Sequence, residues 1–447
     1  MTGKKKEKQT VAIATLGCKV NQCESASFHE KFVEKGCSVT SFSKSADIYV
    51  INTCAVTAKA AAQSRQLIRK AHRCNPDARV IVTGCYAQVE PQKIREILAG
   101  PGFIVGNANK HQLIDAVLSD KKGHKLSLKP LDEKYFKDIA CQKEISLLPV
   151  KRFLGRTRAF LKIQDGCNNF CTYCIVPYAR GRSRSLPMDQ VLDQAGQYTT
   201  EGHSEIVITG IHVGHYGLDL NPPVNLLMML QKLTSLAPEV RFRLSSLEPT
   251  EISDDILMFM MGTDNFMPHL HIPLQSGSNE ILKKMNRKYS AEQFAAIIKQ
   301  CKEKVPDAAI GIDVLVGFPG ETEQNFMETY DLLANLPVTY LHVFPYSRRP
   351  GTPAAKMKNQ VPAKIKAERV AVLRKLDHKK RSVFYESRIG KVHRILVESE
   401  KSKDGLFKGF TENYIPVHFE AKPEHINQVV PVKLKKLMDS NVIGTLL

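Results

Sequence analysis

Three cysteines lie close together in one segment of the chain, at the spacing C-x3-C-x2-C. They are Cys167, Cys171 and Cys174, and they follow directly on the apolar stretch 159–165. Three thiolates on one short loop can hold a metal centre, and three ligands leave one iron of a four-iron cluster open to a small molecule. A structural zinc site is one alternative, but it needs a fourth ligand, and the nearest histidine, His203, lies a helix away. Chance burial of three cysteines is the other.

A second set of three cysteines is dispersed along the chain. Cys18, Cys54 and Cys85 each follow a short apolar stretch. These stretches are 11–17, 47–53 and 78–84. Because the carboxyl ends of parallel strands meet at one edge of an open α/β sheet, the three thiolates could converge there and hold a second cluster. Three ordinary buried cysteines remain the alternative.

The cysteine count and the absence of long apolar runs indicate a cytoplasmic protein. The 11 cysteines are an odd number, which argues against a closed disulfide framework. We expect the other five to be structural: Cys23, Cys37, Cys74, Cys141 and Cys301. Cys23 lies near Cys18 and could replace it as a ligand. No run approaches the ~18 apolar residues of a membrane helix, and the basic N-terminus lacks the features of a secretion signal.

The elements that must position these cysteines alternate between strand-like and helix-like stretches. Within residues 1–125, the three apolar stretches alternate with helices such as 57–73, which predicts an open parallel sheet. A charged linker is expected at 126–152. Residues 153–382 contain six further strands separated by helices, which predicts a partial (β/α)6 barrel with its active site at the C-terminal ends of the strands. The fold class is therefore α/β. The six strands are expected at 159–165, 205–210, 241–246, 270–274, 311–317 and 340–346.

The last segment, 383–447, has a different pattern. Short strands joined by Gly, Pro, Asp and Asn turns predict a small β-barrel, a fold that often binds oligonucleotides. Lys401, Lys403 and Lys408 make it basic, and the whole chain has 64 Lys and Arg against 45 Asp and Glu, a net charge of +19. That surplus favours a polyanionic partner, with nucleic acid ahead of a membrane surface. An inert domain that caps its neighbour is the alternative. The strands are expected at 393–399, 405–411, 414–419 and 428–437.

Several motifs resemble those of the radical S-adenosylmethionine (SAM) methylthiotransferases. The cluster loop, with Tyr173 before its last cysteine, resembles the radical SAM signature. The basic β-domain resembles the TRAM RNA-binding module. The N-terminal motifs are TLGCKVNQ (15–22), NTC (52–54) and TGC (83–85). Further matching blocks are SSLEP (245–249), HIPLQSGS (271–278), GFPGET (317–322) and FPYSRRPGTPA (344–354).

The wording of the first motif resembles one branch of that family. Cys-Lys-Val-Asn-Gln is most similar to the branch that acts on N6-threonylcarbamoyladenosine in tRNA. The isopentenyladenosine branch usually has Gln-Met-Asn after the cysteine, and the branch that acts on a ribosomal protein usually has Pro-Lys-Asn. One departure is Cys23, which stands where the branch commonly has tyrosine, and it places a spare thiol near the second cysteine set.

The resemblance implies two [4Fe-4S] clusters, one on each cysteine set, with SAM as a cofactor. The cluster on Cys167, Cys171 and Cys174 would cleave SAM to a 5′-deoxyadenosyl radical. The second cluster would hold the sulfur, and the methylthio group would end on C2 of the adenosine at position 37, in the anticodon stem-loop. An electron donor and a sulfur donor are required, and the sequence identifies neither. A non-catalytic RNA-binding protein stabilised by zinc is the alternative from another class.

The resemblance and the strand-end positions also single out contacts to SAM and to RNA. Each of these residues could instead pack, cap a helix or form a turn. Arg180, Arg182 and Arg184 follow the cluster loop, and arginine matches phosphate geometry well, so we expect them to contact RNA. The glycines of GFPGET lack the spacing of a phosphate-binding loop. SAM contacts are expected from Tyr173, Thr209, Gly210, Ser245, Ser246, Glu248, Gln275 and Ser276.

Overall fold

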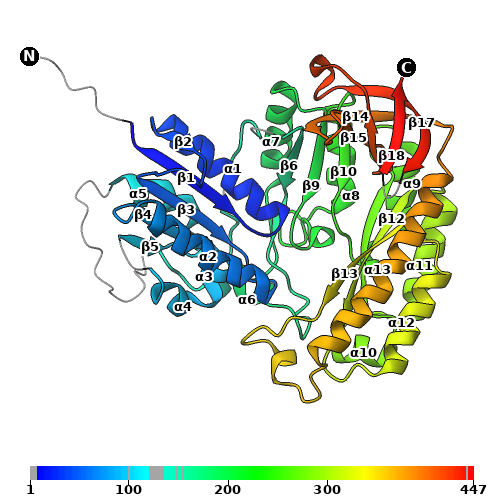
Figure 1. The fold of residues 1–447 in the computed structure, drawn as a ribbon, viewed down its shortest axis with the longest axis horizontal. Helices are drawn as coiled ribbons and strands as arrows, with labels where there is room; N and C mark the ends of the chain where they lie inside the picture. The colour runs from blue at the N-terminus through cyan, green and yellow to red at the C-terminus, as the bar shows by residue number, and fades with distance from the viewer. Residues whose placement is uncertain (1–7, 99–100, 120–134, 147, 154–155, 439–440) are drawn as a thin grey trace, which may run out of the picture.

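Three units follow one another along the chain in the computed structural model, which describes residues 8–98, 101–119, 135–146, 148–153, 156–438 and 441–447. Figure 1 shows an N-terminal sheet domain beside a larger central domain, with the C-terminal strands packed on one end of the central domain. Within the described residues, no helix is long and apolar enough to cross a membrane.

The N-terminal domain is built on a five-stranded parallel sheet in the order β2-β1-β3-β4-β5. Its central strand, β3, is completely buried because helices cover both faces of the sheet. The expected open parallel sheet is confirmed, and Thr57 caps α2 by accepting a hydrogen bond from the Ala60 amide. The strands are β1 (Thr10–Thr15), β2 (Ser38–Thr40), β3 (Ile48–Thr53), β4 (Arg79–Gly84) and β5 (Gly102–Ile104). The helices are α1 (Lys19–Glu34), α2 (Ala58–Cys74), α3 (Cys85–Val89), α4 (Pro91–Arg95), η1 (Asn107–Gln112) and α5 (Leu113–Ser119).

The connection to the central domain contains η2 (Ile139–Cys141). Residues 126–134 and 147 of the expected linker lie outside the described residues.

The central domain contains the six expected strands, each followed by helix. They pair as two separate sheets, β10-β9-β6 and β11-β12-β13, with only the isolated bridges Phe242–Phe266 and Ser246–His271 between them in the described structure. The six strands expected for the partial barrel are therefore confirmed, but the pairing of neighbouring strands is interrupted between β10 and β11. The strands are β6 (Arg158–Lys162), β7 (Gln164–Asp165), β8 (Arg184–Ser185), β9 (Glu205–Thr209), β10 (Arg241–Leu244), β11 (His269–Gln275), β12 (Ala309–Val316) and β13 (Tyr340–Pro345).

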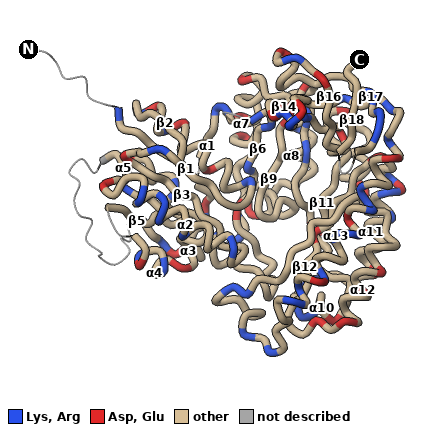
Figure 2. The backbone as a smooth tube through the Cα atoms, in the orientation of Figure 1, with Lys and Arg blue, Asp and Glu red and all other residues tan. Residues whose placement is uncertain are grey.

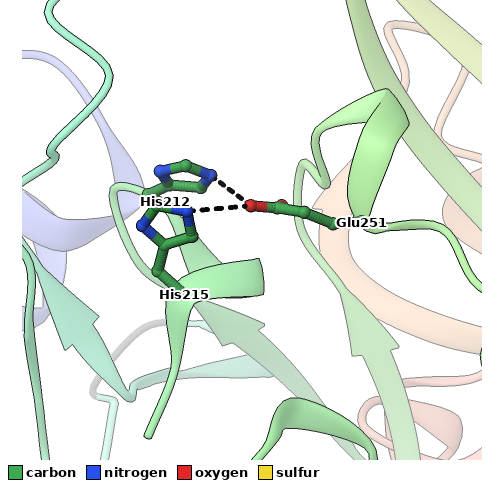
Figure 3. A group of neighbouring side chains, drawn as sticks. All are labelled: His212, His215 and Glu251. Carbon is green, nitrogen blue, oxygen red and sulfur yellow. Dashed lines mark hydrogen bonds and ion pairs between the residues drawn. The ribbon is translucent and has the colours of Figure 1, made fainter. Parts of the chain in front are cut away.

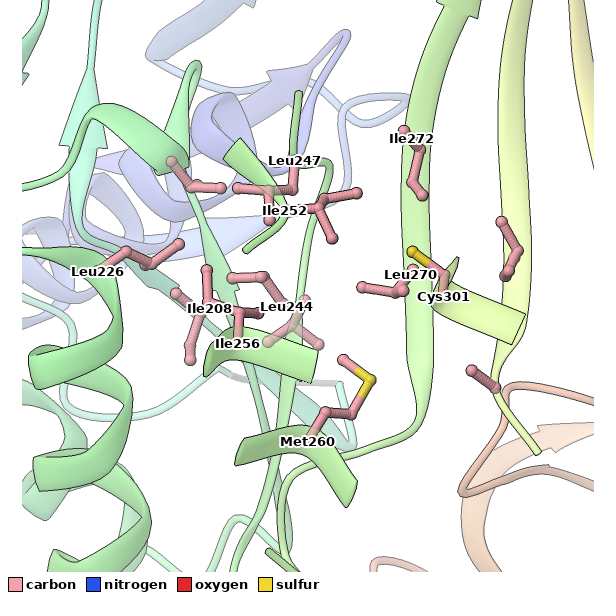
Figure 4. Packing of buried hydrophobic residues seen from close by; sticks show 14 of the residues in the cluster. Ile208, Leu226, Leu244, Leu247, Ile252, Ile256, Met260, Leu270, Ile272 and Cys301 are labelled. Carbon is pink, nitrogen blue, oxygen red and sulfur yellow. The ribbon is translucent and has the colours of Figure 1, made fainter. Parts of the chain in front are cut away.

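Helices on the outside of the central strands bury the largest apolar core. In Figure 4, Ile208, Leu244 and Ile272 of three strands pack with Ile256 and Met260 of α9. The helices are α6 (Val176–Arg180), α7 (Met188–Thr200), α8 (Leu226–Leu236), α9 (Asp254–Gly262), α10 (Asn279–Lys284), α11 (Ala291–Lys304), α12 (Glu323–Asn335) and α13 (Ala363–Glu386). Short 3-10 turns are η3 (Val213–His215), η4 (Pro249–Glu251) and η5 (Pro353–Lys356).

The C-terminal strands form a closed barrel in the order β14-β15-β16-β18-β17, as expected. The barrel docks on the beginnings of the central strands: Arg158 of β6 pairs with Glu398 at 2.9 Å, and Arg241 of β10 donates to the Arg394 carbonyl at 2.6 Å. Helix α13 continues across the expected domain boundary at 382. The elements are β14 (Val392–Lys401), β15 (Phe407–Thr411), β16 (Pro416–Phe419), η6 (Pro423–His425), β17 (Val429–Met438) and β18 (Asn441–Leu446).

Candidate catalytic site with two cysteine trios

Cys167, Cys171 and Cys174, here called the barrel trio, occupy the loop between β7 and α6. Hydrogen bonds to distant segments hold this loop: the Cys167 amide donates to Gly181 O at 3.1 Å, and the Thr172 amide donates to Met285 O at 3.0 Å. The backbone amide of Asn169 donates to the Cys167 sulfur at 3.4 Å. The loop is therefore fixed at the carboxyl ends of the central strands, where the sequence placed it.

The thiols of the barrel trio are close enough to influence one another electrostatically. Burial raises the pKa of Cys174 to about 12, and Cys171 and Cys167 add to the rise. Burial also raises the pKa of Cys171, opposed by Arg287, which donates to the Cys171 sulfur at 3.3 Å. Because buried thiols favour the protonated form, a metal centre would be needed to stabilise three thiolates here. The all-thiol donor set fits an iron–sulfur cluster.

Cys18, Cys54 and Cys85, here called the sheet trio, lie at the carboxyl ends of β1, β3 and β4. These strands are neighbours in the sheet, so three distant cysteines meet at one edge. Burial raises the pKa of Cys54 to about 12, with Cys85 and Cys18 contributing. This mutual influence shows that the three thiols are gathered together, and their donor set fits a second cluster.

Two glycines allow the strand ends of the sheet trio to approach so closely. Gly17 has a φ of +93°, and a Cβ built on it would lie 2.8 Å from the Cys54 sulfur. Gly84 has a φ of +95°, and a Cβ there would lie 2.4 Å from the Thr53 carbonyl. Both positions require the left-handed backbone that glycine adopts without strain. The Gly-Cys pairs of the sequence motifs therefore have a steric cause.

The two trios are joined by a direct contact between short helices. Helix α3 begins at Cys85, and helix α6 begins soon after Cys174; the two helices pack together. Ile175 and Ala179 belong to the same apolar cluster as Cys85 and Tyr86. The N-terminal and central domains thus meet at the two cysteine sites.

A buried ion-pair network lies beside this contact. Arg180, at the end of α6, is 1% exposed and donates to Asp165 Oδ1 at 2.9 Å and to Glu24 Oε1 at 3.1 Å. Lys110 also pairs with Glu24, and Lys162 pairs with Asp165 at 2.8 Å. Burial raises the pKa of Glu24, but Arg180, Lys110 and Lys162 outweigh it and lower that pKa to about 2. Against the effect of burial, Arg180 likewise lowers the pKa of Asp165, so both carboxylates are ionised. Asp165 binds Arg180 within the central domain, and Glu24 binds it from across the domain boundary.

This network corrects two sequence expectations. Arg180 and Arg184 were expected to contact RNA, but they are only 1% and 5% exposed. The guanidinium of Arg180 is occupied by carboxylates, and that of Arg184 donates to the Arg180 carbonyl at 2.5 Å. The RNA role is wrong for both residues because neither can reach a phosphate. Arg182 is exposed, and its guanidinium lies 4.5 Å from the centre of the Phe170 ring.

The residues expected to contact SAM lie near the barrel trio to differing degrees. Glu248 binds Arg287, the residue that donates to Cys171, so it belongs to the surroundings of the trio. Tyr173 is half-buried and packs on an apolar cluster with Phe318. Ser276 is 2% exposed, and its hydroxyl accepts from the Ser278 amide, which makes it a loop-forming residue. The remaining positions are at the ends of β9, β10 and β11: Thr209, Gly210, Ser245, Ser246 and Gln275. Contact with SAM stays a prediction for all of them.

A histidine pair that the sequence analysis missed also borders the barrel trio. His212 Nδ1 lies 3.5 Å from the Cys167 sulfur, and its Nε2 lies 2.5 Å from Glu251 Oε1. His215 stacks on His212 and also faces Glu251 at 3.5 Å (Figure 3). The position of His212, just after the apolar strand β9, was the available signal.

The lysines expected to bind RNA lie on the surface of the C-terminal barrel. Lys401 and Lys403 are exposed at the end of β14 and in the following turn, whereas Lys408 pairs with Glu400 at 3.3 Å. Figure 2 shows further basic residues along β17, where Lys433, Lys435 and Lys436 are exposed.

Comparison with known families assigns the two cysteine trios to two different family matches. Residues 10–106 match the family described as "Uncharacterized protein family UPF0004", and residues 161–333 match the radical SAM superfamily. Each match contains one complete cysteine trio. Among solved structures, the radical SAM methyltransferase TsrM from Kitasatospora setae is similar in fold, with a TM-score of 0.55 and 14% identity over 78% of this chain and 77% of that one.

Curated relatives match nearly the whole chain. The chain is 42% identical to the threonylcarbamoyladenosine tRNA methylthiotransferase MtaB of Bacillus subtilis over 96% of its own length and 94% of the relative. It is 40% identical to the MtaB of Aquifex aeolicus over 93% of this chain and 97% of the relative. The tRNA-2-methylthio-N(6)-dimethylallyladenosine synthase of Acetivibrio thermocellus is 31% identical over 100% of this chain and 92% of the relative. The chain therefore belongs to the radical SAM methylthiotransferase family.

Proposed function

We propose that this protein converts N6-threonylcarbamoyladenosine at position 37 of tRNA, next to the anticodon, to its 2-methylthio derivative. The MtaB relatives named for this substrate, at up to 42% identity, favour it over the dimethylallyl branch. The observation that carries the proposal is the junction of the two cysteine trios through α3 and α6, because sulfur insertion needs both sites close to one substrate atom.

The chain's own residues hold and orient the reacting groups. When bound, a [4Fe-4S] cluster on the barrel trio would supply the 5′-deoxyadenosyl radical from SAM, and a second on the sheet trio would supply the sulfur. Arg287 donates to the Cys171 sulfur and binds Glu248, so it fixes the loop of the barrel trio. Arg180, Glu24 and Asp165 fix the two trios relative to each other. Among the predicted SAM contacts, we favour Tyr173, which precedes Cys174, and Glu248, which binds Arg287 beside Cys171.

The C-terminal barrel would act as a TRAM-like RNA-binding domain. Lys401 and Lys403 on this barrel, and Arg182 beside the cluster loop, offer exposed cations to phosphates. Neutralising Lys401 and Lys403 together should weaken tRNA binding and reduce its salt dependence, while the SAM cleavage rate stays unchanged.

Anaerobic reconstitution tests the two-cluster proposal directly. The wild-type chain should bind about eight irons, two four-iron clusters. Cys54→Ala should keep about four irons and cleave SAM to 5′-deoxyadenosine, yet form no methylthio product. Cys167→Ala should lose SAM cleavage as well. Cys37→Ala is the matched control, because Cys37 is a buried cysteine of the same domain outside both trios.

Mass spectrometry of the tRNA nucleosides identifies the substrate. Loss of 2-methylthio-N6-threonylcarbamoyladenosine from a deletion strain is the expected result. Loss of the isopentenyl derivative or of a ribosomal-protein modification would overturn the substrate assignment. Full product formation by Cys54→Ala would overturn the mechanism.

A further inference from the structure

Lys19 is placed to reach from the N-terminal domain toward the central domain. It is the first residue of α1, directly after Cys18, and the only charged residue of the Cys-Lys-Val-Asn-Gln motif. Residues four apart share one face of a helix, so Lys19 lies on the same face as Cys23. The Cys23 thiol donates to the Phe160 carbonyl of β6 at 3.2 Å. Lys19 therefore belongs to the face of α1 that packs on the central domain, and Figure 1 shows this end of α1 directed toward the central strands.

The central domain and the C-terminal barrel each present an aromatic polar side chain within electrostatic reach of Lys19, His269 and Tyr414 respectively. The pKa of His269 is lowered first by burial and then by cationic neighbours that include His271 and Lys19. Lys19 also helps to lower the pKa of Tyr414, a shift caused mainly by Arg158 against the effect of burial. The rings of His269 and Tyr414 are 4.7 Å apart. Lys19 thus lies within electrostatic reach of the first residue of β11.

A polar wall continues from His269 along the same face of the second central sheet. His271 on β11 lies 2.8 Å from Asp313 on β12, and His342 on β13 lies 3.4 Å from the same carboxylate. The residues that alternate with them, Ile272 and Val314, belong to the apolar core beneath the helices. The histidines and Asp313 therefore line the inner side of the barrel, and the His342 side chain is 46% exposed there.

Three other cations at this domain boundary each have a carboxylate partner, whereas Lys19 has none in the described structure. Lys110 pairs with Glu24, Lys162 with Asp165 at 2.8 Å, and Arg180 with both carboxylates. Within the described parts of the chain, Lys19 has neither an ion-pair partner nor a side-chain hydrogen bond, although it is only partly exposed. A partly exposed lysine without an ion-pair partner in the described structure, beside a cysteine of the sheet trio, favours an anionic ligand group.

We propose that Lys19 binds the carboxylate of the threonylcarbamoyl group of the substrate adenosine, with His271, Asp313 and His342 forming the polar wall around the rest of that group. The inference rests on the proposed function and names the part of the substrate that is recognised. An α-carboxylate is ionised at neutral pH, and a charge-assisted hydrogen bond in a partly dry site is strong. An uncharged hydrocarbon substituent would leave the ammonium and the polar wall unpaired, so the site rejects it.

A chemically matched pair of RNA ligands tests the inference. One anticodon stem-loop carries N6-threonylcarbamoyladenosine, and the other carries its methyl ester, which lacks the negative charge. Binding to the cluster-reconstituted protein is measured by fluorescence anisotropy. The wild type should bind the acid more tightly than the ester by about tenfold to a hundredfold. Lys19→Met should lose that preference while its affinity for the ester stays unchanged, and Lys19→Arg should retain most of it.

Controls separate this inference from the proposed function. Lys31→Met makes the same change on the same helix, away from the boundary, and should behave as wild type. Iron per chain is measured for every variant, because Lys19 adjoins Cys18. If Lys19→Met loses iron, the inference is decided by the wild-type protein alone, from its preference for the RNA with the acid over the RNA with the ester. Equal wild-type affinity for acid and ester, or equal weakening of both by Lys19→Met, overturns the inference. Methylthiolation of the acid RNA by the wild type tests the function separately.

Discussion

Replacing Arg180 with methionine should loosen the contact between the two cysteine trios without changing any cysteine. Methionine keeps the apolar stem of the side chain and removes the guanidinium. That guanidinium lies within 2.9 and 3.0 Å of the two oxygens of Asp165 and within 3.1 Å of Glu24. It also donates to Asn21 Oδ1 at 2.5 Å.

The size of the effect follows from these contacts. A hydrogen bond to a charged group contributes about 1.5–3 kcal/mol, and Arg180 serves two carboxylates. Lys110 and Lys162 still compensate Glu24 and Asp165 after the change, so neither carboxylate is left without a counter-charge. The loss of charge-assisted bonds to two carboxylates therefore has an expected cost of about 3–5 kcal/mol, below the upper sum of about 6 kcal/mol because both carboxylates keep a counter-charge.

Hydrogen exchange measured by mass spectrometry gives the local readout. Amides of α3 and α6 should exchange about a hundredfold to a few thousandfold faster in Arg180→Met, since each 1.4 kcal/mol is tenfold. Arg182→Met makes the same change at an exposed site of the same segment and should leave the exchange rates of the α3 and α6 amides unchanged. The amides of β15, which lies in the C-terminal barrel, should exchange at the wild-type rate in both variants. If the amides of α3 and α6 exchange in Arg180→Met at the same rate as in the wild type, the reasoning that Arg180 joins the two trios is refuted.

Two further predictions concern neighbours of this contact. The pKa of Glu24 is lowered from 4.5 to about 2, so the ionised Glu24 stabilises the fold fully above pH 4.5, and this contribution is lost as the pH falls toward 2. The melting temperature measured by calorimetry should therefore fall between pH 4.5 and pH 2. In Glu24→Gln the fall should be less steep. An equally steep fall in Glu24→Gln would show that other groups cause it. Cys23 is 4% exposed, burial raises its pKa, and its thiol is bonded to the Phe160 carbonyl, so it is a poor iron ligand. Cys23→Ala should therefore keep the wild-type iron content after reconstitution, and a loss of about four irons would make Cys23 a ligand.

The positions of the sheet trio could be predicted because each cysteine directly follows an apolar run. Parallel strands place their carboxyl ends together, so local patterns at Cys18, Cys54 and Cys85 were enough to predict a convergence in space. The strands β2 and β5 have only three residues each, too few for a recognisable periodicity.

The role of Arg180 could not be predicted from its neighbours in the chain. An arginine in a basic run is usually solvated, and it is almost never fully buried unless it is paired. Its partner Glu24 is 156 positions away, on a helix whose sequence shows no special acidic pattern. Only the packing of the N-terminal domain on the central domain brings Glu24 of α1 to Arg180 of α6, and such long-range pairing leaves no local signal. His212 differs, because its place just after β9 was visible.

The docking of the C-terminal barrel on the beginnings of the central strands has a consequence for the size of the RNA footprint. The cysteine loop lies at the opposite ends of those strands, which have between 4 residues in β10 and 8 in β12. At 3.3 Å per residue, the two ends are separated by roughly 13 to 26 Å. A minimal RNA containing only the modified nucleotide and its immediate neighbours is thus too short to touch both ends. A stem of several base pairs would be the smallest fragment that engages the whole enzyme.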